Sequence, residues 1–165
     1  MGQSHNHKVA LMNKENVYHL SKTHGPPVVD LQHGMIGDDW GDRSNAKLPT
    51  PHQIPEDVTR DQLDHYGSAV FSYMEDSDLL FYLYPIAKVY AEDPSFEWID
   101  GYMYTLDKRI EAIFGTLGPH DRDALVDGLM WIWESGGIDN ADWYQCRHLQ
   151  KVIGIDVERD EQGMS

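Results

Sequence analysis

Residues 96–117, FEWIDGYMYTLDKRIEAIFGTL, carry the clearest structural signal in this chain. Apolar side chains recur along them at alternating intervals of three and four residues, which is typical of the buried side of an α-helix. The positions are Phe96, Ile99, Met103, Leu106, Ile110, Ile113 and Leu117. We therefore expect a helix here, started by Pro94-Ser95 and ended by Gly118-Pro119.

The residues before this stretch predict two more helices. Thr59 and Gln62 have the spacing of a capping box, and apolar side chains then recur at helical intervals to about residue 75. Ser77 can cap a second helix, whose residues 79–84 are apolar on nearly every side, as in a buried central helix. Pro85 lies inside that helix and is expected to kink it or split it in two.

The residues after the stretch predict the last two helices. Pro119 suits the first turn of a helix that Ser135-Gly136-Gly137 should end. Asp139 or Asn140 then caps a final helix that ends at Gly154. The predicted fold class is mainly α, a compact bundle of about five helices over residues 59–154.

The first 55 residues differ in composition from the rest. They hold five of the eight prolines and six of the nine histidines, and residues 38–55 are expected to form an irregular arm. Short β-favouring runs predict two or three small strands, at Val9–Met12, Val17–Leu20 and Val28–Leu31. We therefore divide the chain into a His- and Pro-rich region at 1–55, an acidic helical domain at 56–154 and a polar tail at 155–165.

The net charge of −15 arises entirely after residue 55. Residues 1–55 hold five acidic and five basic side chains, whereas residues 56–165 hold 23 acidic and 8 basic ones. A field of this sign repels nucleic acids and membrane surfaces and steers basic proteins toward the chain. The charge therefore predicts a basic protein partner, with no direct nucleic-acid binding and no membrane.

Cysteine content and hydropathy predict a cytoplasmic protein. Cys146 is the only cysteine, which excludes an internal disulfide and suits a reducing compartment. No segment approaches the roughly 20 apolar residues of a membrane-spanning helix, and the first residues lack the apolar run of a signal peptide.

Two of the predicted helices carry acidic stripes, each with a large aromatic side chain among the carboxylates. At 100° per residue, the acidic positions of each helix recur on one side of it. The stripes are Glu97, Asp100, Tyr104, Asp107 and Glu111 on one helix, and Asp123, Asp127, Trp131 and Glu134 on the next. An aromatic inside a charged surface has the composition of a binding hot spot, so we predict these residues as the partner-binding site. The alternative is that both stripes are solvated helix faces and that the N-terminal region or the last helix covers Trp131.

Other chemistry has less support in the sequence. His5-x-His7 and Asp30-x-x-His33 could each supply two metal ligands, but a metal site needs three or four that converge. Cys146 and His148 point in different directions on a helix, so the histidine cannot serve as the base for the thiol. We therefore predict no cofactor, no metal and no catalytic residue.

A second set of residues resembles a known family. Residues 79–86, LLFYLYPI, follow an acidic helix and precede Phe114-x-x-Leu117-Gly118-Pro119 and a tryptophan-bearing helix. This arrangement resembles an uncharacterised family of small bacterial helical proteins over about residues 56–135, although the family has threonine where this chain has Gly118. The resemblance implies a helical fold and no catalytic residue. In general build the chain also resembles cytosolic toxin-immunity proteins, which are small, acidic and not catalytic.

These observations together predict a bacterial or phage-encoded immunity-type protein. It would act as a non-enzymatic inhibitor that binds and occludes a basic partner, such as a nuclease toxin or a nucleic-acid-binding effector. One alternative is a small metal-dependent enzyme whose site lies in the His-rich N-terminal region. Another is a self-associating structural subunit with Trp131 in a homodimer interface.

Overall fold

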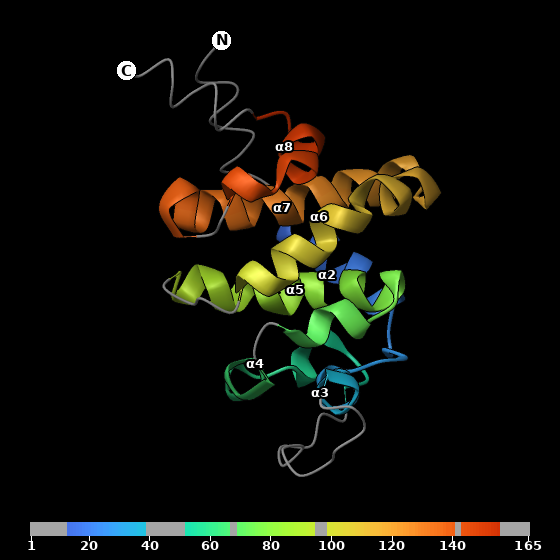
Figure 1. Ribbon diagram of the computed structural model, residues 1–165. Helices are drawn as coiled ribbons and strands as arrows, with labels where there is room; N and C mark the ends of the chain where they lie inside the picture. Colours follow the sequence, from blue (N-terminus) through green and yellow to red (C-terminus); the bar gives the residue numbers. More distant parts are fainter. Residues whose placement is uncertain (1–12, 39–51, 67–68, 95–98, 141–142, 156–165) are drawn as a thin grey trace.

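The computed structural model describes residues 13–38, 52–66, 69–94, 99–140 and 143–155 (Figure 1). Within these ranges every regular element is helical, which confirms the mainly α prediction. The α-helices are α2 (Lys14–Thr23), α3 (Leu31–Asp38), α4 (Arg60–Tyr66), α5 (Asp76–Glu92), α6 (Ile99–Thr116), α7 (Pro119–Asn140) and α8 (Arg147–Ile153). Short 3₁₀ helices lie at η1 (Pro55–Asp57), η2 (Ala69–Tyr73) and η3 (Trp143–Gln145).

Helices α4 to α8 lie within residues 59–154, but α2 and α3 lie before them, so the prediction of about five helices with a small-β N-terminal region is wrong for the described residues. Residues 17–20 lie in α2, where Asn13 caps the helix by accepting a hydrogen bond from Asn16 N at 3.0 Å. Residues 28–31 lead into α3, and the expected strand Val9–Met12 lies outside the described residues. The cap at Asn13 and the burial of Val17, Leu20 and Ser21 on one side of a helix outweigh the β preference of the short apolar runs.

The predicted helix at 59–75 begins as expected and is shorter. Gln62 N donates to Thr59 Oγ1 at 3.2 Å, and Thr59 N donates to Gln62 Oε1 at 3.0 Å, so the capping box forms. The α-helix ends at Tyr66, and η2 occupies residues 69–73.

Helix α5 lies across the middle of the molecule and is not split at Pro85 (Figure 1). Proline inside a helix weakens the backbone hydrogen bonds of its own turn. The buried Ser21 hydroxyl of α2 lies beside that turn, where it accepts from Tyr84 N at 2.9 Å and donates to the Leu80 carbonyl at 2.8 Å. Ser21 therefore supplies hydrogen bonds to α5 one residue before the proline.

Helix α7 runs past the predicted stop at Ser135-Gly136-Gly137 to Asn140 because its glycines serve packing. A Cβ on Gly128 would stand 2.6 Å from the Leu83 side chain, and one on Gly136 would stand 1.8 Å from the Tyr90 hydroxyl. Both contacts are with α5, so the glycines allow the two helices to approach closely.

The last helix is also shorter than predicted. It begins at Arg147 after η3, and Gly154 ends it in the left-handed conformation at φ 77°. A glycine adopts this conformation without strain, so the predicted end at Gly154 is correct.

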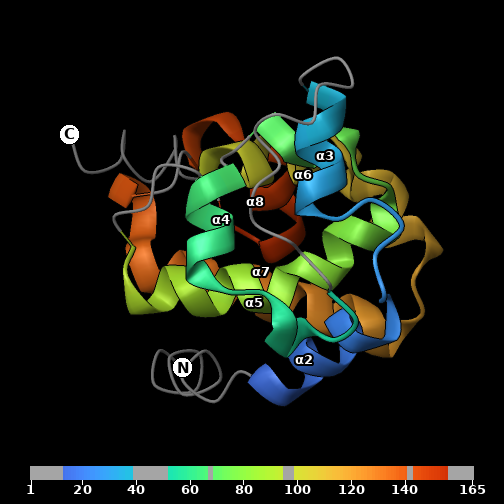
Figure 2. The same ribbon diagram turned by 90° about the horizontal axis from the view of Figure 1, so that it is seen from below.

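The helices are arranged around α5. In Figure 1, α7 and α8 lie on one side of it and α3 and α4 on the other, and Figure 2 shows α2 alongside α5. Helix α2 packs against both α5 and α7, and α8 packs against α6 and α7. The core is rich in fully buried aromatic side chains, which include Phe71, Phe81, Tyr82, Tyr90, Tyr102 and Trp143.

Candidate functional site

Three carboxylates lie along one side of α7. Asp123, Asp127 and Glu134 fall within about 40° of each other around the helix axis and span roughly 16 Å along it. Asp123 and Glu134 are exposed, and Asp127 is half-buried. Among the described residues, neither Asp123 nor Glu134 takes part in an ion pair. We call these three residues the outer face of α7.

Trp131, the aromatic predicted within this stripe, is buried. Its side chain is 6% exposed and packs against the Tyr84 ring at a centroid distance of 5.7 Å. Lys14 Nζ lies 4.8 Å from the centroid of the Trp131 ring. Helix α2 thus covers a position that the helical pattern places near solvent, which is the alternative that the sequence left open. The half-buried Met130 lies within about 40° of the middle of the outer face.

The stripe on α6 is largely engaged with the rest of the fold. Asp107 is 9% exposed, and its carboxylate accepts a hydrogen bond from Leu149 N at 3.0 Å. Leu149 lies in the first turn of α8, where backbone N–H groups have no partner within the helix. Asp107 therefore caps α8 from a neighbouring helix.

The other members of that stripe have varied surroundings. Glu111 is exposed and pairs with His148 Nδ1 at 3.0 Å. Tyr104 is half-buried and packs against the core, and Asp100 is half-buried. Glu97 lies outside the described residues. The structure thus aligns the carboxylates of the outer face of α7. The α6 stripe differs, because Asp107 and Glu111 contact other parts of the fold.

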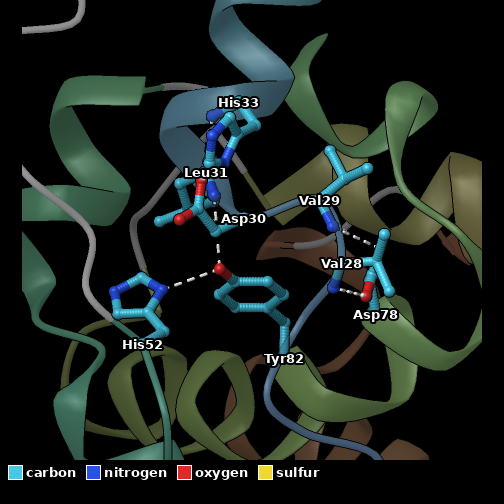
Figure 3. Close-up of polar contacts among 8 residues, drawn as sticks. All are labelled: Val28, Val29, Asp30, Leu31, His33, His52, Asp78 and Tyr82. Carbon is cyan, nitrogen blue, oxygen red and sulfur yellow. Dashed lines mark hydrogen bonds and ion pairs between the residues drawn. The ribbon is translucent and has the colours of Figure 1, made fainter.

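A buried carboxylate on α5 holds a loop that the sequence did not single out. Asp78 is 0% exposed and accepts hydrogen bonds from Val28 N at 2.8 Å and Val29 N at 3.0 Å, as Figure 3 shows. It also accepts from Glu75 N at 3.0 Å, at the start of α5. The spacing from Glu75 to Asp78 is a helix-start signal, but nothing in the sequence indicates the loop at residues 28–29.

A second buried group, Tyr82, connects two further segments to α5. Its hydroxyl oxygen accepts from Leu31 N at 3.2 Å and lies 2.7 Å from His52 Nδ1 (Figure 3). On the other side of the imidazole, His52 Nε2 lies 2.7 Å from Gln62 Oε1. Because that amide oxygen is an acceptor, Nε2 carries the proton and Nδ1 accepts from the tyrosine hydroxyl.

Burial sets the ionisation of both rings. It lowers the pKa of His52 below its usual 6.5, and the hydrogen bond to Gln62 and the charges of Asp30 and Asp57 oppose this shift only in part. Burial also raises the pKa of Tyr82 above the range of an exposed tyrosine. Both groups are therefore neutral near pH 7.

Asp78, Tyr82 and His52 form what we call the buried cluster. Their burial limits the chemistry that they can perform. His52 is 3% exposed and Tyr82 0% exposed, so neither ring is open to a substrate among the described residues. What the cluster does is join residues 28–31, residue 52 and the start of α4 to α5.

The described residues offer no metal centre. Nowhere in the ranges that the structure describes do three His, Cys, Asp or Glu side chains gather in a group able to hold a metal ion. Asp30 and His33 bond to each other, with Asp30 Oδ1 2.8 Å from His33 Nδ1, and His5 and His7 lie outside the described residues. Cys146 is buried at the start of α8.

Comparison with models of protein families, with curated proteins and with solved structures finds no match to this chain. Among the described residues, no helix combines the length and the apolar character needed to cross a membrane.

Proposed function

We propose that this chain is a non-enzymatic, immunity-type inhibitor that binds a basic partner protein in the cytoplasm and occludes its working surface. A nuclease toxin or a nucleic-acid-binding effector has the required positive surface. The observation that carries the proposal is the outer face of α7, which presents aligned carboxylates on a chain with a net charge of −15.

The two acidic stripes do not contribute equally to this proposal. Asp107 serves as a helix cap and Glu111 pairs with His148, so the α6 stripe has structural uses for its charge. Asp123 and Glu134 have no ion-pair partner among the described residues, so their charge is available to steer a cationic surface. The proposed interface is therefore centred on α7, with Asp127 and Met130 within it.

Such an interface has a characteristic dependence on salt. Exposed charges at an interface act mainly on the association rate, and screening weakens them because the Debye length falls to about 8 Å at physiological ionic strength. We expect tight binding at low salt and slower association as salt is added.

The test is binding and inhibition against the basic proteins encoded beside this gene. The proposal predicts that one of them binds tighter than about 1 μM at low salt and loses its activity in the complex. If none binds more tightly than that, or if binding leaves the partner fully active, the inhibitor function is wrong.

A further inference from the structure

We propose that a groove between α6, α7 and α8 is a second docking site, which takes a segment of a partner protein that presents an apolar side chain beside a carboxylate. The groove has a volume of about 480 Å³, within the usual range of ligand pockets. The groove is apolar with basic side chains, whereas the outer face of α7 is acidic. It is therefore a separate surface from the one proposed above.

The floor of the groove is apolar and open. Phe114 and Val152 line it and are half-buried against the core. Gly115 lies in the last turns of α6 and is exposed. Apart from its chain neighbours and the backbone of its own helix, no described atom lies within 4 Å of the place where its Cβ would stand. An aliphatic or aromatic side chain of a partner can therefore reach Phe114 and Val152 without moving this helix.

The wall of the groove is basic, which is unusual in this chain. Arg122, His148 and Lys151 line it, against a single carboxylate from Glu111. Glu111 Oε1 lies 3.0 Å from His148 Nδ1, so this carboxylate already has a hydrogen-bond partner. The groove thus presents Arg122 and Lys151 as cations in a region where acidic residues outnumber basic ones by 23 to 8.

Arg122 is held in a position suited to a carboxylate. Its Nε donates to the Phe114 carbonyl at 2.9 Å, and its guanidinium carbon lies 5.2 Å from the centroid of the Phe114 ring. This contact uses one nitrogen to satisfy a carbonyl near the end of α6. No acceptor for the two terminal nitrogens is found in the described part of the chain. A guanidinium fixed in this way keeps the paired donors that match a carboxylate.

The net charge of the chain favours a polypeptide over a nucleic acid as the ligand of the groove. A nucleic acid brings a continuous row of phosphates, which a net charge of −15 repels. A short helical segment with one or two carboxylates beside a leucine carries far less charge and matches both the apolar floor and the basic wall.

The probe is a blocked helical peptide of about twelve residues with leucine and glutamate on one face, titrated into isotope-labelled full-length protein. A matched peptide carries glutamine in place of glutamate. We expect shifts of the Gly115, Lys151 and Val152 amide signals, and binding of the glutamine peptide weaker by at least about fivefold. Equal binding of the two peptides would overturn the carboxylate preference, and shifts that do not centre on these residues would overturn the site.

Gly115→Leu blocks the groove without disturbing a hydrogen bond. The new side chain enters open space, and glycine lowers helix stability, so folding is not at risk. Ala91→Leu on α5 is the matched control, since Ala91 is exposed and does not line the groove. We expect Gly115→Leu to weaken the glutamate peptide at least about tenfold and Ala91→Leu to leave it unchanged. Undiminished binding to Gly115→Leu would show that the groove is not the docking site.

Discussion

The α6 and α7 stripes look alike in sequence and differ in the structure. Each has carboxylates at three- and four-residue spacing and one aromatic side chain. On α6 the carboxylate of Asp107 is buried as a cap for α8, and Glu111 pairs with His148. On α7 the carboxylates of Asp123 and Glu134 stay exposed, while the aromatic Trp131 is the buried member.

The difference shows what a helical pattern can and cannot specify. The spacing of residues gives the angle of each side chain around its own helix. It does not say which neighbouring helix lies against that angle, and here α2 covers one edge of α7 while α8 covers part of α6. An acidic stripe is therefore a candidate surface only where no neighbour uses its charge.

The largest effect should come from removing the buried aromatic of α7. Trp131→Ala should lower the free energy of unfolding by about 3–5 kcal/mol, because the ring packs against Tyr84 and beneath Lys14. Glu134→Ala, one turn further along the same helix, should change it by less than about 0.5 kcal/mol. Urea unfolding of both variants measures these changes in the free energy of unfolding. A small effect of Trp131→Ala would show that the ring is exposed and not buried.

A smaller loss should follow from removing the cap on α8. Asp107→Ala leaves the buried Leu149 N–H without its acceptor, which should cost about 1–3 kcal/mol. Asp107→Asn keeps an acceptor oxygen and should cost less, and Asp123→Ala on α7 should cost least. Equal stability of Asp107→Ala and Asp123→Ala would mean that the two stripes do not differ as described.

Mild acid should destabilise the fold through His52. The pKa of His52 is lowered by burial, so below about pH 6.5 the unfolded chain binds the proton more readily than the folded one. Stability should be full above that pH and should fall as the pH drops toward the folded-state pKa. Protonation also places a donor at Nδ1 against the Tyr82 hydroxyl, which already accepts from Leu31 N.

The comparison of two histidine variants tests the source of this acid sensitivity. His52→Gln should flatten the dependence of the urea midpoint on pH between about pH 7.5 and 5, where carboxyl groups in general stay ionised. His120→Gln, at an exposed position of α7, should leave the dependence as in the unmodified chain. An unchanged slope in His52→Gln would assign the acid sensitivity to other groups.

The smallest effect is expected at the exposed pair on α6. Glu111→Gln should change the free energy of unfolding by about 0–1 kcal/mol, because Glu111 and His148 are both largely in solvent. At high salt, the free energy of unfolding of this variant should equal that of the unmodified chain. A loss of unfolding free energy as large as that of Asp107→Ala would show that the Glu111–His148 pair stabilises the fold as much as the Asp107 cap does.

Much of the helical fold was predictable from spacing and capping. The pattern over 96–117 predicted α6, and Thr59 and Gln62 predicted the start of α4. The failures involve tertiary contacts. Gly136 faces Tyr90 and does not end α7, and residues 17–20 lie in α2 despite their β preference. Neither outcome can be derived without knowing what packs against these positions.

The buried cluster was not predictable from the sequence. Asp78, Tyr82 and His52 come from positions up to 30 residues apart, and their partners include backbone N–H groups, which have no signature in a sequence. The partner-binding role of the outer face of α7 stays a prediction. Its exposure could be judged only after the position of α2 was known.

The central claim is that the outer face of α7 guides a basic partner to this chain. The most direct measurement is the association rate of that partner with two double variants of equal charge, Asp123→Lys with Glu134→Lys and Asp61→Lys with Glu92→Lys. All four positions are exposed. At low salt the α7 variant should associate at least about tenfold more slowly than the unmodified chain and depend less on salt, with a much smaller change in the control. Equal slowing of the two variants would contradict the claim, because net charge and not the face on α7 would then govern binding.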